Sequence, residues 1–366
     1  MLFKSSRRYF DAVSLKKEMK KKTKHPTLSE VARKAGVGTT TVSRVINGGL
    51  RVDPETKARV LRAIKSLGYV PNHAARILKG YRTRTIGLII PSISDPFFSS
   101  CADAVQSVAR ANDSLLIVTT TQNTTASEIE SLNVLIRHRA DGLIIAPSSS
   151  RSLALRDALQ SVAVPVVALD RPVLTLPITS VLTNNLKSAQ LATEHLIAHG
   201  YRRIVCVTGE LNLYTIQERV RGYRKAMQAA GLECRLETSV IDYQTAQSAL
   251  EALLDGPDRP EAIFTLKNSA TIYVFEELQR LHTAIPKSVA LLGFDDFEFA
   301  PIVRPSISVV QQPIQEMGRV AAEILFERLQ KSSQPALRNR ASHAKQVIVP
   351  TQFIPRSSCG CAGAAD

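Results

Sequence analysis

Apolar runs that alternate with amphipathic segments constrain the fold of this chain most strongly. From Thr85 onward, short runs rich in Val, Ile and Leu recur, and segments with apolar residues at helical spacing separate them. Strands that are apolar at every position are typical of parallel sheets, because helices cover both faces of such a sheet. The pattern occurs twice, so we predict two doubly wound α/β lobes. Ligands bind this kind of fold beyond the carboxyl ends of the strands, here between the lobes.

The predicted elements follow the apolar pattern along the chain. Strands are expected over Ile86–Ile90, Leu115–Thr119, Gly142–Ala146, Val166–Leu169, Ile204–Thr208, Ala262–Thr265 and Val289–Phe294, with Val347–Phe353 as a returning strand. Helices are expected over Ala102–Ala111, Ile129–His138, Ala189–His199, Arg219–Ala230 and Ala270–Arg280.

The body as a whole is expected over residues 85–358, and its chain is expected to cross between the lobes three times. We place the crossings near 182–184, 311–312 and 333–346. The predicted lobe boundaries are about 85–182 with 312–333 for the first lobe, and about 184–311 with 346–358 for the second. Residues 359–366 are expected to form a tail, and the closing S-S-C-G-C run is expected to be disordered.

Basic charge is concentrated in the first quarter of the chain. Residues 1–84 contain 21 Lys and Arg against 5 Asp and Glu, and the whole chain carries a net charge of +15. The remaining residues are therefore nearly neutral, which indicates a polyanion-binding head on an electrically ordinary body. Residues 1–24 are interpreted as a basic, disordered extension, and Met19 is an alternative start to Met1.

The composition also excludes several classes of protein. No apolar run approaches the ~20 residues that a membrane-spanning helix needs. The five cysteines are scattered, which argues against a disulfide framework or a zinc site and favours a reducing cytoplasm. No arrangement of catalytic residues, metal ligands or phosphate-binding loops is evident, so we expect neither an enzyme nor a bound cofactor or metal.

Residues 25–70 have the signals of three short helices. Thr27 and Glu30 form a capping box, and apolar residues then recur at helical spacing until Gly36. A second helix is expected from Thr39 to the stop at Asn47-Gly48-Gly49, and a third from Asp53-Pro54 to Gly68. Three short helices with a tight turn between the first two form a helix-turn-helix unit.

Several spaced motifs together resemble one family. The chain contains V-x-x-x-A-G-V-x-T-T-T-V-S-R-V-I-N over residues 31–47, G-Y-V-P-N over 68–72, D-P-F-F over 95–98, G-F-D-D over 293–296 and Q-Q-P over 311–313. In this order they resemble the lactose-repressor (LacI/GalR) family of bacterial transcription regulators, from about Thr27 to Ser358. The resemblance implies a DNA-binding headpiece and a periplasmic-binding-protein-like body.

The resemblance assigns base reading to Thr39, Thr40 and Arg44. Thr40 and Arg44 are four residues apart and share a helix face, and a major groove admits one such helix. Arginine can donate to both O6 and N7 of guanine. The alternative is an ordinary exposed polar face. Thr41 and Ser43 are candidates for phosphate contacts, and Gly38 replaces a serine that is usual in the family at the helix start.

Residues 71–84 are expected to form a hinge helix and linker. The segment P-N-H-A-A-R-I-L-K over residues 71–79 resembles the family's hinge, and so short a helix is marginal alone. Our hypothesis is that it folds when paired with its twin on DNA, where Leu78 would enter the minor groove as an apolar wedge. The alternative is that Leu78 packs against the body.

Six residues of the body match the family's effector pocket. They are Phe98, Asp170, Arg219, Lys267, Asn268 and Asp295. Carboxylates, an amide, an arginine and an aromatic ring suit a polyhydroxylated ligand such as a sugar. Ser269 and Asn184 stand where the family often has Asp, and Lys267 stands where it often has a small residue. These changes make the cleft less negative, which would tolerate a sugar acid.

The sequence therefore predicts a cytoplasmic transcription regulator, most plainly a repressor. It would bind a pseudo-palindromic operator in double-stranded DNA as a homodimer, or as a tetramer, under control of a sugar or sugar acid. One alternative is a solute-binding protein with the same body fold. Another is a non-specific architectural DNA-binding protein, which would bind all sequences with similar affinity.

Overall fold

The computed structural model describes residues 26–46, 52–70, 82–332 and 345–361. The chain divides into two compact units, residues 1–81 and residues 82–366. The predictions for residues 1–24, including the start at Met1 or Met19, lie outside the described residues, as do those for the hinge segment 71–79 and Leu78. No helix among the described residues is both long and apolar enough to span a membrane.

The first unit contains the predicted helices around a small core. They are α2 (Leu28–Ala35), α3 (Thr39–Ile46) and α4 (Pro54–Leu67). The capping box is confirmed, since Glu30 N–H donates to the Thr27 hydroxyl and the Glu30 carboxylate accepts from Thr27 N–H. Gly36 ends α2 with φ of +64°, a conformation that glycine adopts without strain. Val31, Val42 and Val60 are completely buried and join the three helices.

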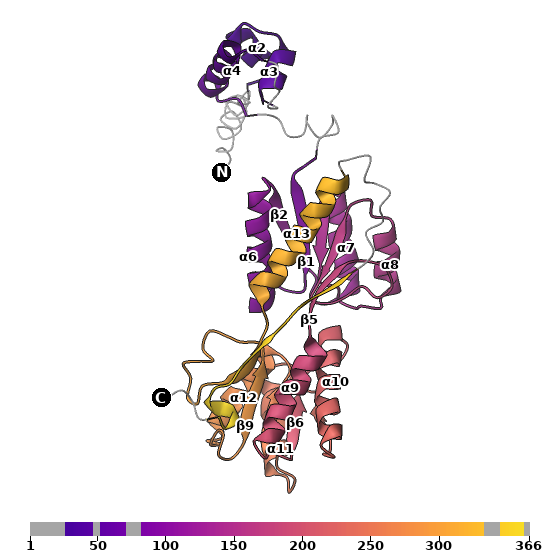
Figure 1. Cartoon of the computed structure of the whole chain (residues 1–366), viewed down its shortest axis with the longest axis vertical. Helices are drawn as coiled ribbons and strands as arrows, with labels where there is room; N and C mark the ends of the chain where they lie inside the picture. Colours follow the sequence, from indigo (N-terminus) through magenta and orange to yellow (C-terminus); the bar gives the residue numbers. More distant parts are fainter. Residues whose placement is uncertain (1–25, 47–51, 71–81, 333–344, 362–366) are drawn as a thin grey trace, which may run out of the picture. The chain divides into compact units, whose positions relative to one another are not determined.

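The second unit contains two lobes, each built on a six-stranded sheet (Figure 1). The first lobe has the sheet order β11-β5-β4-β3-β1-β2. Its strands are β1 (Thr85–Ile90), β2 (Leu115–Thr120), β3 (Gly142–Ile145), β4 (Val166–Leu169), β5 (Ser180–Thr183) and β11 (Gln346–Val349). Its helices are α6 (Pro96–Ala111), α7 (Thr125–Arg137), α8 (Leu153–Gln160) and α13 (Ile314–Ser332).

The second lobe repeats this plan with the sheet order β12-β10-β9-β8-β6-β7. Its strands are β6 (Ile204–Val207), β7 (Arg235–Glu237), β8 (Ala262–Thr265), β9 (Ala290–Phe294), β10 (Ser308–Gln311) and β12 (Gln352–Ile354). Its helices are α9 (Asn185–Ala198), α10 (Tyr214–Ala229), α11 (Tyr243–Asp255) and α12 (Asn268–Arg280). The single-turn 3-10 helix η2 (Ser357–Cys359) follows β12.

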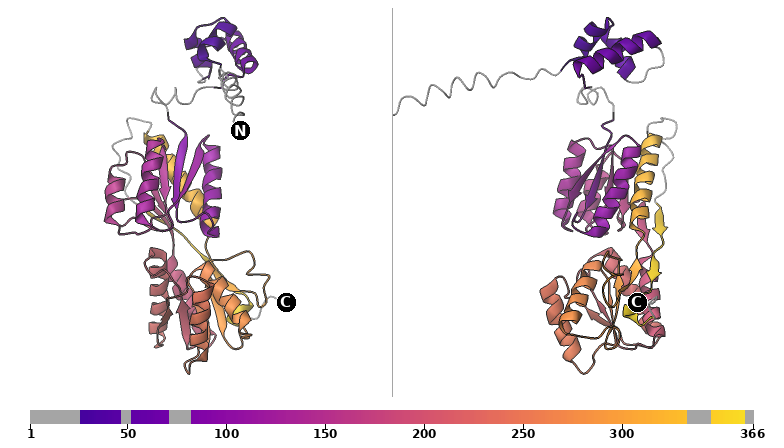
Figure 2. Two further views of the ribbon diagram at one scale, coloured as in Figure 1. Left: turned by 180° about the vertical axis from the view of Figure 1, so that it is seen from behind. Right: turned by 90° about the vertical axis from the view of Figure 1, so that its left-hand side faces the viewer.

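Helices cover both faces of each sheet, as the apolar runs predict (Figure 2). In the first lobe, Ile86 and Leu88 face the core under α6 and α13, whereas Ile89 faces the core under α7 and α8. In the second lobe, Cys206 faces α9 and α10, whereas Val205 faces α11 and α12. The α/β fold class predicted from the sequence is therefore confirmed.

Helix starts differ from the prediction more than strand ends do. The helix predicted over Ala102–Ala111 begins at Pro96, because the Asp95 carboxylate accepts from Phe97 N–H and caps the helix there. The helix predicted over Arg219–Ala230 begins at Tyr214. The first turns also carry buried apolar residues, Phe97 and Phe98 in α6 and Ile216 in α10, so the prediction overlooked start signals such as Asp95-Pro96.

The last crossing between the lobes differs from our prediction. We expected Val347–Phe353 to form one strand of the second lobe. Instead, β11 pairs in parallel with β5 in the first lobe, and β12 pairs antiparallel with β10 in the second. The chain crosses after Pro350, where Thr351 N–H donates to Asn184 Oδ1 at 2.9 Å. The expected crossing at 333–346 and the placement of residues 346–349 in the second lobe are therefore wrong.

The closing S-S-C-G-C run is ordered, which also corrects our prediction. The Ser358 side chain accepts from Ser308 N–H at 2.8 Å and donates to the Leu291 carbonyl at 2.6 Å. Cys359 is completely buried. These bonds attach η2 to strands β9 and β10, so small polar residues that resemble a tail in sequence form part of the second lobe.

Candidate functional site

Helix α3 of the first unit carries the predicted DNA-reading residues on its exposed side. Val42 and Val45 are buried against α2 and α4, which fixes the orientation of the helix. Thr39, Thr40 and Arg44 are exposed as a result. A short helix that presents hydroxyls and a guanidinium beyond its buried face has the form required to enter a major groove.

The remaining features of α3 agree with this orientation. Thr41 and Ser43, the predicted phosphate contacts, are half-buried beside the exposed face. Gly38 precedes the helix, and its carbonyl accepts from the N–H groups of Thr41 and Val42. A Cβ added at Gly38 would meet no atom of the described residues within 4 Å, so the usual serine would fit among them.

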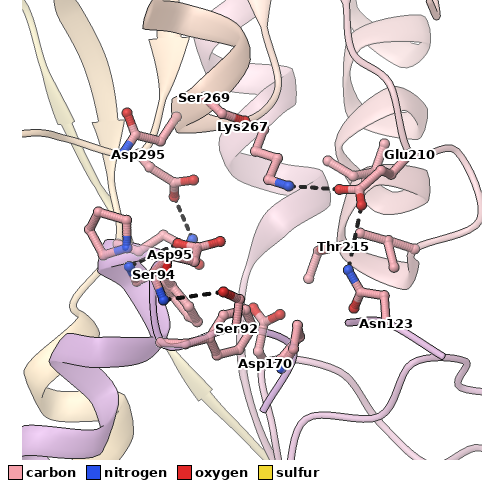
Figure 3. Close-up of a pocket in the computed structure, with 18 of the residues that line it drawn as sticks. Ser92, Ser94, Asp95, Asn123, Asp170, Glu210, Thr215, Lys267, Ser269 and Asp295 are labelled. Atoms are coloured by element: carbon pink, nitrogen blue, oxygen red, sulfur yellow. Dashed lines mark hydrogen bonds and ion pairs between the residues drawn. The ribbon is translucent and has the colours of Figure 1, made fainter. Parts of the chain in front are cut away.

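A cavity of about 470 Å³ lies in the second unit, beyond the carboxyl ends of the strands of both lobes (Figure 3). Each of the strands β1, β2, β4, β6, β8 and β9 is followed by residues that line it. The structure brings together all six predicted pocket residues: Phe98, Asp170, Arg219, Lys267, Asn268 and Asp295. This is the position at which doubly wound folds bind ligands, and the volume is that of a small-molecule site.

Two buried carboxylates occupy equivalent strand ends in the two lobes. Asp170 follows β4 with φ of +67°, and Asp295 follows β9 with φ of +74°. Left-handed backbone is costly for a residue with a side chain, although aspartate tolerates it better than most. Burial raises the pKa of Asp170, against the opposing effects of Arg171 and Arg219. Burial also raises the pKa of Asp95 at the edge of the cavity.

Arg219 extends from α10 and is almost completely buried. Its Nε donates to Asn185 Oδ1 and its Nη1 to the Leu266 carbonyl, both at 2.7 Å, and Nη1 lies 3.8 Å from Asp295 Oδ2. The guanidinium lies 3.6 Å from the ring centroid of Phe294. Burial lowers the pKa of Arg219, while Asp295 opposes the effect. The side chain is thus held rigidly at the wall of the cavity.

Asn268 and Phe98 complete the predicted set. Asn268 begins α12, and its Oδ1 atom is buried without a hydrogen-bond partner among the described residues. A buried acceptor without a donor is costly, so the atom is suited to accept from a ligand. Phe98 is buried on α6, edge-on to Phe97, and the Arg171 guanidinium lies 5.8 Å from its ring centroid.

Hydrogen bonds join the two lobes across the cavity. Arg171 donates from Nε to Asp170 at 3.2 Å and from Nη1 to Asn123 Oδ1 at 2.8 Å. Asn123 Nδ2 then donates to Glu210 of the second lobe at 3.4 Å, and Lys267 Nζ donates to the other oxygen of Glu210 at 2.7 Å (Figure 3). We call these five residues, Asp170, Arg171, Asn123, Glu210 and Lys267, the interlobe chain.

The interlobe chain changes the charge balance that we inferred from the sequence. Lys267 is paired with Glu210 and adds no free positive charge to the cavity. The residues that line the cavity include four carboxylates against three cations, namely Asp95, Asp170, Glu210 and Asp295 against Arg171, Arg219 and Lys267. The argument for an anionic ligand therefore loses its main support.

Sequence reasoning missed Asn123, Arg171, Glu210 and Gln312. Each lies in a loop after a strand, and loops carry no periodicity that marks a binding residue. One signal was available, because Arg171 follows Asp170 directly and Gln312 lies in the Q-Q-P motif. Gln312 Nε2 donates to Asp295 at 2.5 Å, and the Thr183 hydroxyl donates to Gln312 at 2.9 Å. Asp295, at the wall of the cavity, is thereby connected to two of the crossing segments.

Comparison with known proteins agrees with both units. The profile of "bacterial regulatory proteins, lacI family" matches residues 27–72, and that of a "periplasmic binding protein-like domain" matches residues 193–359. The ribose operon repressor of Escherichia coli strain K12 is 32% identical over 326 residues, which cover 88% of this chain and 98% of the relative. The transcriptional repressor PurR of Vibrio vulnificus is 32% identical over 307 residues, covering 83% and 92%.

Solved structures show the same fold. A lac repressor dimer bound to operator and the anti-inducer ONPF superposes with a TM-score of 0.81 at 22% identity, covering 92% of this chain and 99% of that one. A complex of the transcriptional regulator CelR with cellobiose gives a TM-score of 0.66 at 29% identity, covering 91% and 100%. The two relatives at 32% identity, which match 88% and 83% of this chain, show that the protein belongs to the lacI family of bacterial regulatory proteins.

Proposed function

We propose that this protein is a sequence-specific repressor of transcription whose affinity for its operator is controlled by a neutral sugar bound between the two lobes. The observation that carries the ligand class is the cavity between the strand ends. It combines a buried, partnerless acceptor on Asn268 with two buried carboxylates and a rigid arginine. Such groups recognise several hydroxyls at fixed positions.

A neutral ligand suits this cavity better than an acid. The four carboxylates of the lining outnumber its three cations, and Lys267 is already bonded to Glu210. A ligand carboxylate would approach Asp170 and Asp295 without a free cation to compensate it, which costs binding energy. The names of the relatives, ribose operon repressors among them, make D-ribose the first sugar to test.

The DNA-binding role is supported by the exposed face of α3. Thr39, Thr40 and Arg44 are proposed to read base edges, and Thr41 and Ser43 to contact phosphates. We keep the proposal that Leu78, outside the described residues, enters the minor groove. A homodimer in the cytoplasm would place two headpieces on a pseudo-palindrome, as the symmetry of a two-fold assembly requires.

The crossing segments offer a route from the cavity to DNA affinity. Asp295 is bonded to Gln312, and Gln312 to Thr183, so a ligand on Asp295 is connected to two crossings through these hydrogen bonds. The bond from Asn123 to Glu210 joins the lobes on the other side. A ligand that replaces or strengthens these bonds changes the preferred angle between the lobes. Its coupling to operator affinity is necessarily reciprocal.

Selection of DNA sites from a random pool tests the proposed DNA specificity. The full-length protein should enrich an inverted repeat at near-physiological salt, and it should bind that site roughly 10³-fold or more tightly than random DNA. The matched variant Arg44→Ala should lose much of this ratio while it retains binding to random DNA. Equal affinity for all sequences, with a steep salt dependence, would identify an architectural DNA-binding protein instead.

Calorimetry with a matched pair of ligands tests the proposed ligand class. D-Ribose is a cyclic neutral sugar and D-ribonate is an open-chain anion, so the neutral open-chain ribitol serves as the control that separates charge from ring form. We expect D-ribose or another neutral sugar, such as cellobiose, to bind and the corresponding acid to bind at least tenfold more weakly, about 1.4 kcal/mol. Preference for the acid would contradict the charge argument while leaving the DNA-binding proposal untouched.

A further inference from the structure

Four side chains with metal-ligating atoms meet in the second lobe, outside the cavity. His195 lies in the last turn of α9, and His199 is the residue at which that helix ends. Cys359 and Cys361 come from η2 and the turn after it. One ligand atom from each of the four lies within 4.8 Å of all the others. None of the four lines the cavity or belongs to the DNA-reading helix.

Four of the six distances between the ligand atoms are close to those of a tetrahedral site, and the other two are no longer than 4.8 Å. His195 Nε2 lies 3.3 Å from Cys359 Sγ and 3.5 Å from Cys361 Sγ, and His199 Nε2 lies 3.3 Å from Cys361 Sγ. The two sulfur atoms are 3.4 Å apart. Zinc bonds of about 2.3 Å to sulfur and 2.0–2.1 Å to nitrogen would separate neighbouring ligands by roughly 3.3–3.8 Å. Only small adjustments would therefore place one ion among these four atoms.

The local structure aims the ligands at one point. His195 and His199 are four residues apart, so they share one face of α9. The ring of Phe353 packs against His195 with 4.6 Å between the ring centroids, and Tyr201 stacks on His199 with 6.4 Å between the centroids. These contacts restrict both imidazoles. Packing of this kind limits the rotamers that the two imidazoles can adopt.

The turn between the two cysteines requires glycine at position 360. Gly360 has φ of +95°, and a Cβ there would lie 2.8 Å from the Tyr201 hydroxyl oxygen. Glycine therefore permits the reversal that brings both sulfur atoms to the same side. The hydrogen bonds of Ser358 to β9 and β10 hold this turn in place, so the dithiol is not a mobile tail.

We propose that His195, His199, Cys359 and Cys361 bind one zinc ion, which fastens the C-terminal segment to α9. Four protein ligands leave no open position, so the ion would be structural and not catalytic. Two imidazoles and two thiolates are a common ligand set of structural zinc sites. We expected no metal site from the sequence, because His195 and Cys359 are 164 residues apart and neither pair alone is distinctive.

Metal analysis of the full-length, untagged protein tests this proposal. The protein would be purified with zinc present, kept reduced with a phosphine, and dialysed before its metal content is measured. We expect one zinc per chain for the unchanged protein and for the control Cys234→Ser, whose thiol lies in the same lobe outside the cluster. The double variant Cys359→Ser/Cys361→Ser should contain almost none.

Cobalt and a chelator give independent readouts. Cobalt(II) should produce thiolate charge-transfer bands and the strong visible bands of a tetrahedral ion in the unchanged protein and in Cys234→Ser only. A chelator should lower the Tm of these two proteins and leave that of the double variant unchanged, because bound metal stabilises the folded state.

A single variant keeps the test decisive if the double variant does not fold. His199 is exposed at the end of α9, so His199→Asn should fold and bind zinc more than about tenfold more weakly. Unchanged zinc affinity in this variant would overturn the assignment. So would a folded protein that, with its thiols shown to be reduced, contains no zinc and gives no cobalt bands. A disulfide between Cys359 and Cys361 that persists in the phosphine would overturn it too. Neither result would bear on the repressor function.

Discussion

At the cavity, each lobe places an aspartate on the same backbone conformation, but the two aspartates are bonded to different side chains. Asp170 and Asp295 follow equivalent strands with similar positive φ, and each N–H donates at 2.9 Å to the next strand, at Val181 and Val310. Asp170 is bonded to its neighbour Arg171, within its own lobe. Asp295 is bonded to Gln312, in a segment that crosses between the lobes.

This difference suggests a division of roles between the lobes. A ligand that contacts Asp170 acts on the interlobe chain through Arg171 and Asn123. A ligand that contacts Asp295 acts on the crossing segments through Gln312 and Thr183. The second lobe also supplies Arg219, which is anchored to Asn185 immediately after the first crossing. We therefore expect the second lobe to act on the crossing segments and the first lobe to act on the bond between Asn123 and Glu210.

Loss of the buried arginine should have the largest effect. Arg219→Ala removes the partner of Asp295 and the donors to Asn185 and Leu266, so we expect it to cost about 3–5 kcal/mol of stability and to abolish ligand binding. Urea unfolding and calorimetry measure the two effects.

The matched control is Arg221→Ala in the same helix, whose side chain is 64% exposed. It should change stability by less than about 0.5 kcal/mol. If Arg219→Ala is as mild as Arg221→Ala, the second lobe does not depend on its arginine and the proposed division of roles is wrong.

The helix pairs of the two lobes differ in how tightly they pack. A Cβ at Gly222 of α10 would lie 2.2 Å from the Leu186 carbonyl oxygen of α9, whereas one at Gly318 of α13 would lie 2.7 Å from the Cys101 carbonyl oxygen of α6. We expect both substitutions with alanine to destabilise by about 1–3 kcal/mol, with Gly222→Ala the more costly.

Urea unfolding of the two variants would show whether the second lobe is the tighter. Gly256→Ala is the control, because its nearest atom would lie 3.6 Å away. It should unfold close to the unchanged protein. A larger loss for Gly318→Ala than for Gly222→Ala would reverse the comparison of the helix pairs.

Asn268 should separate stability from binding. Its partnerless Oδ1 atom costs free energy in the unliganded protein, so Asn268→Ala should leave stability unchanged or raise it by about 1 kcal/mol. The same variant should weaken sugar binding by about tenfold, because one ligand hydroxyl loses its acceptor. Thermal unfolding and calorimetry on one preparation measure both quantities.

The control for Asn268→Ala is Asn133→Ala, at an exposed position of α7. We expect it to change neither stability nor sugar affinity. Strong destabilisation by Asn268→Ala would mean that the asparagine is structural, and unchanged affinity would remove it from the binding site.

The smallest effect concerns pH and the first lobe. Burial raises the pKa of Asp170, so the folded protein retains a proton that the unfolded chain has already released. Stability should therefore fall as pH rises from the unfolded value of about 3.9 through the folded pKa, and then level off. Asp170→Asn should flatten this part of the profile.

Urea unfolding at a series of acidic pH values checks the expected slope. The exposed Asp157→Asn should leave the profile unchanged. An Asp170→Asn profile with the same slope as the unchanged protein would show that Asp170 does not hold the proton. In that case Asp170 would be a charged carboxylate, which could also accept hydrogen bonds from the hydroxyls of a ligand.

The sequence predicted the fold well because the fold depends on buried runs and helix caps. Val166–Leu169 and Ala262–Thr265 match β4 and β8 at both ends, since apolar residues stop where the sheet stops. The strand predicted over Val347–Phe353 failed, because an apolar pattern does not record which of two sheets a residue joins.

The site was predictable only in part. Asp170 and Asp295 stand directly after apolar runs, and the family motif marks Arg219 and Asn268. The interlobe chain was not predictable, because Asn123 and Glu210 meet only after both lobes have formed and their interaction is a single hydrogen bond. The cysteine and histidine cluster was missed for the same reason, since its two halves come from distant parts of the chain.

The central claim is that a sugar between the lobes controls operator affinity. The most direct measurement is the Kd of the full-length protein for its selected DNA site, with and without a saturating sugar that calorimetry shows to bind. We predict a change of about 5–150-fold, 1–3 kcal/mol of coupling, which in Asn268→Ala should require about tenfold more sugar. An unchanged Kd with the sugar bound would contradict the account.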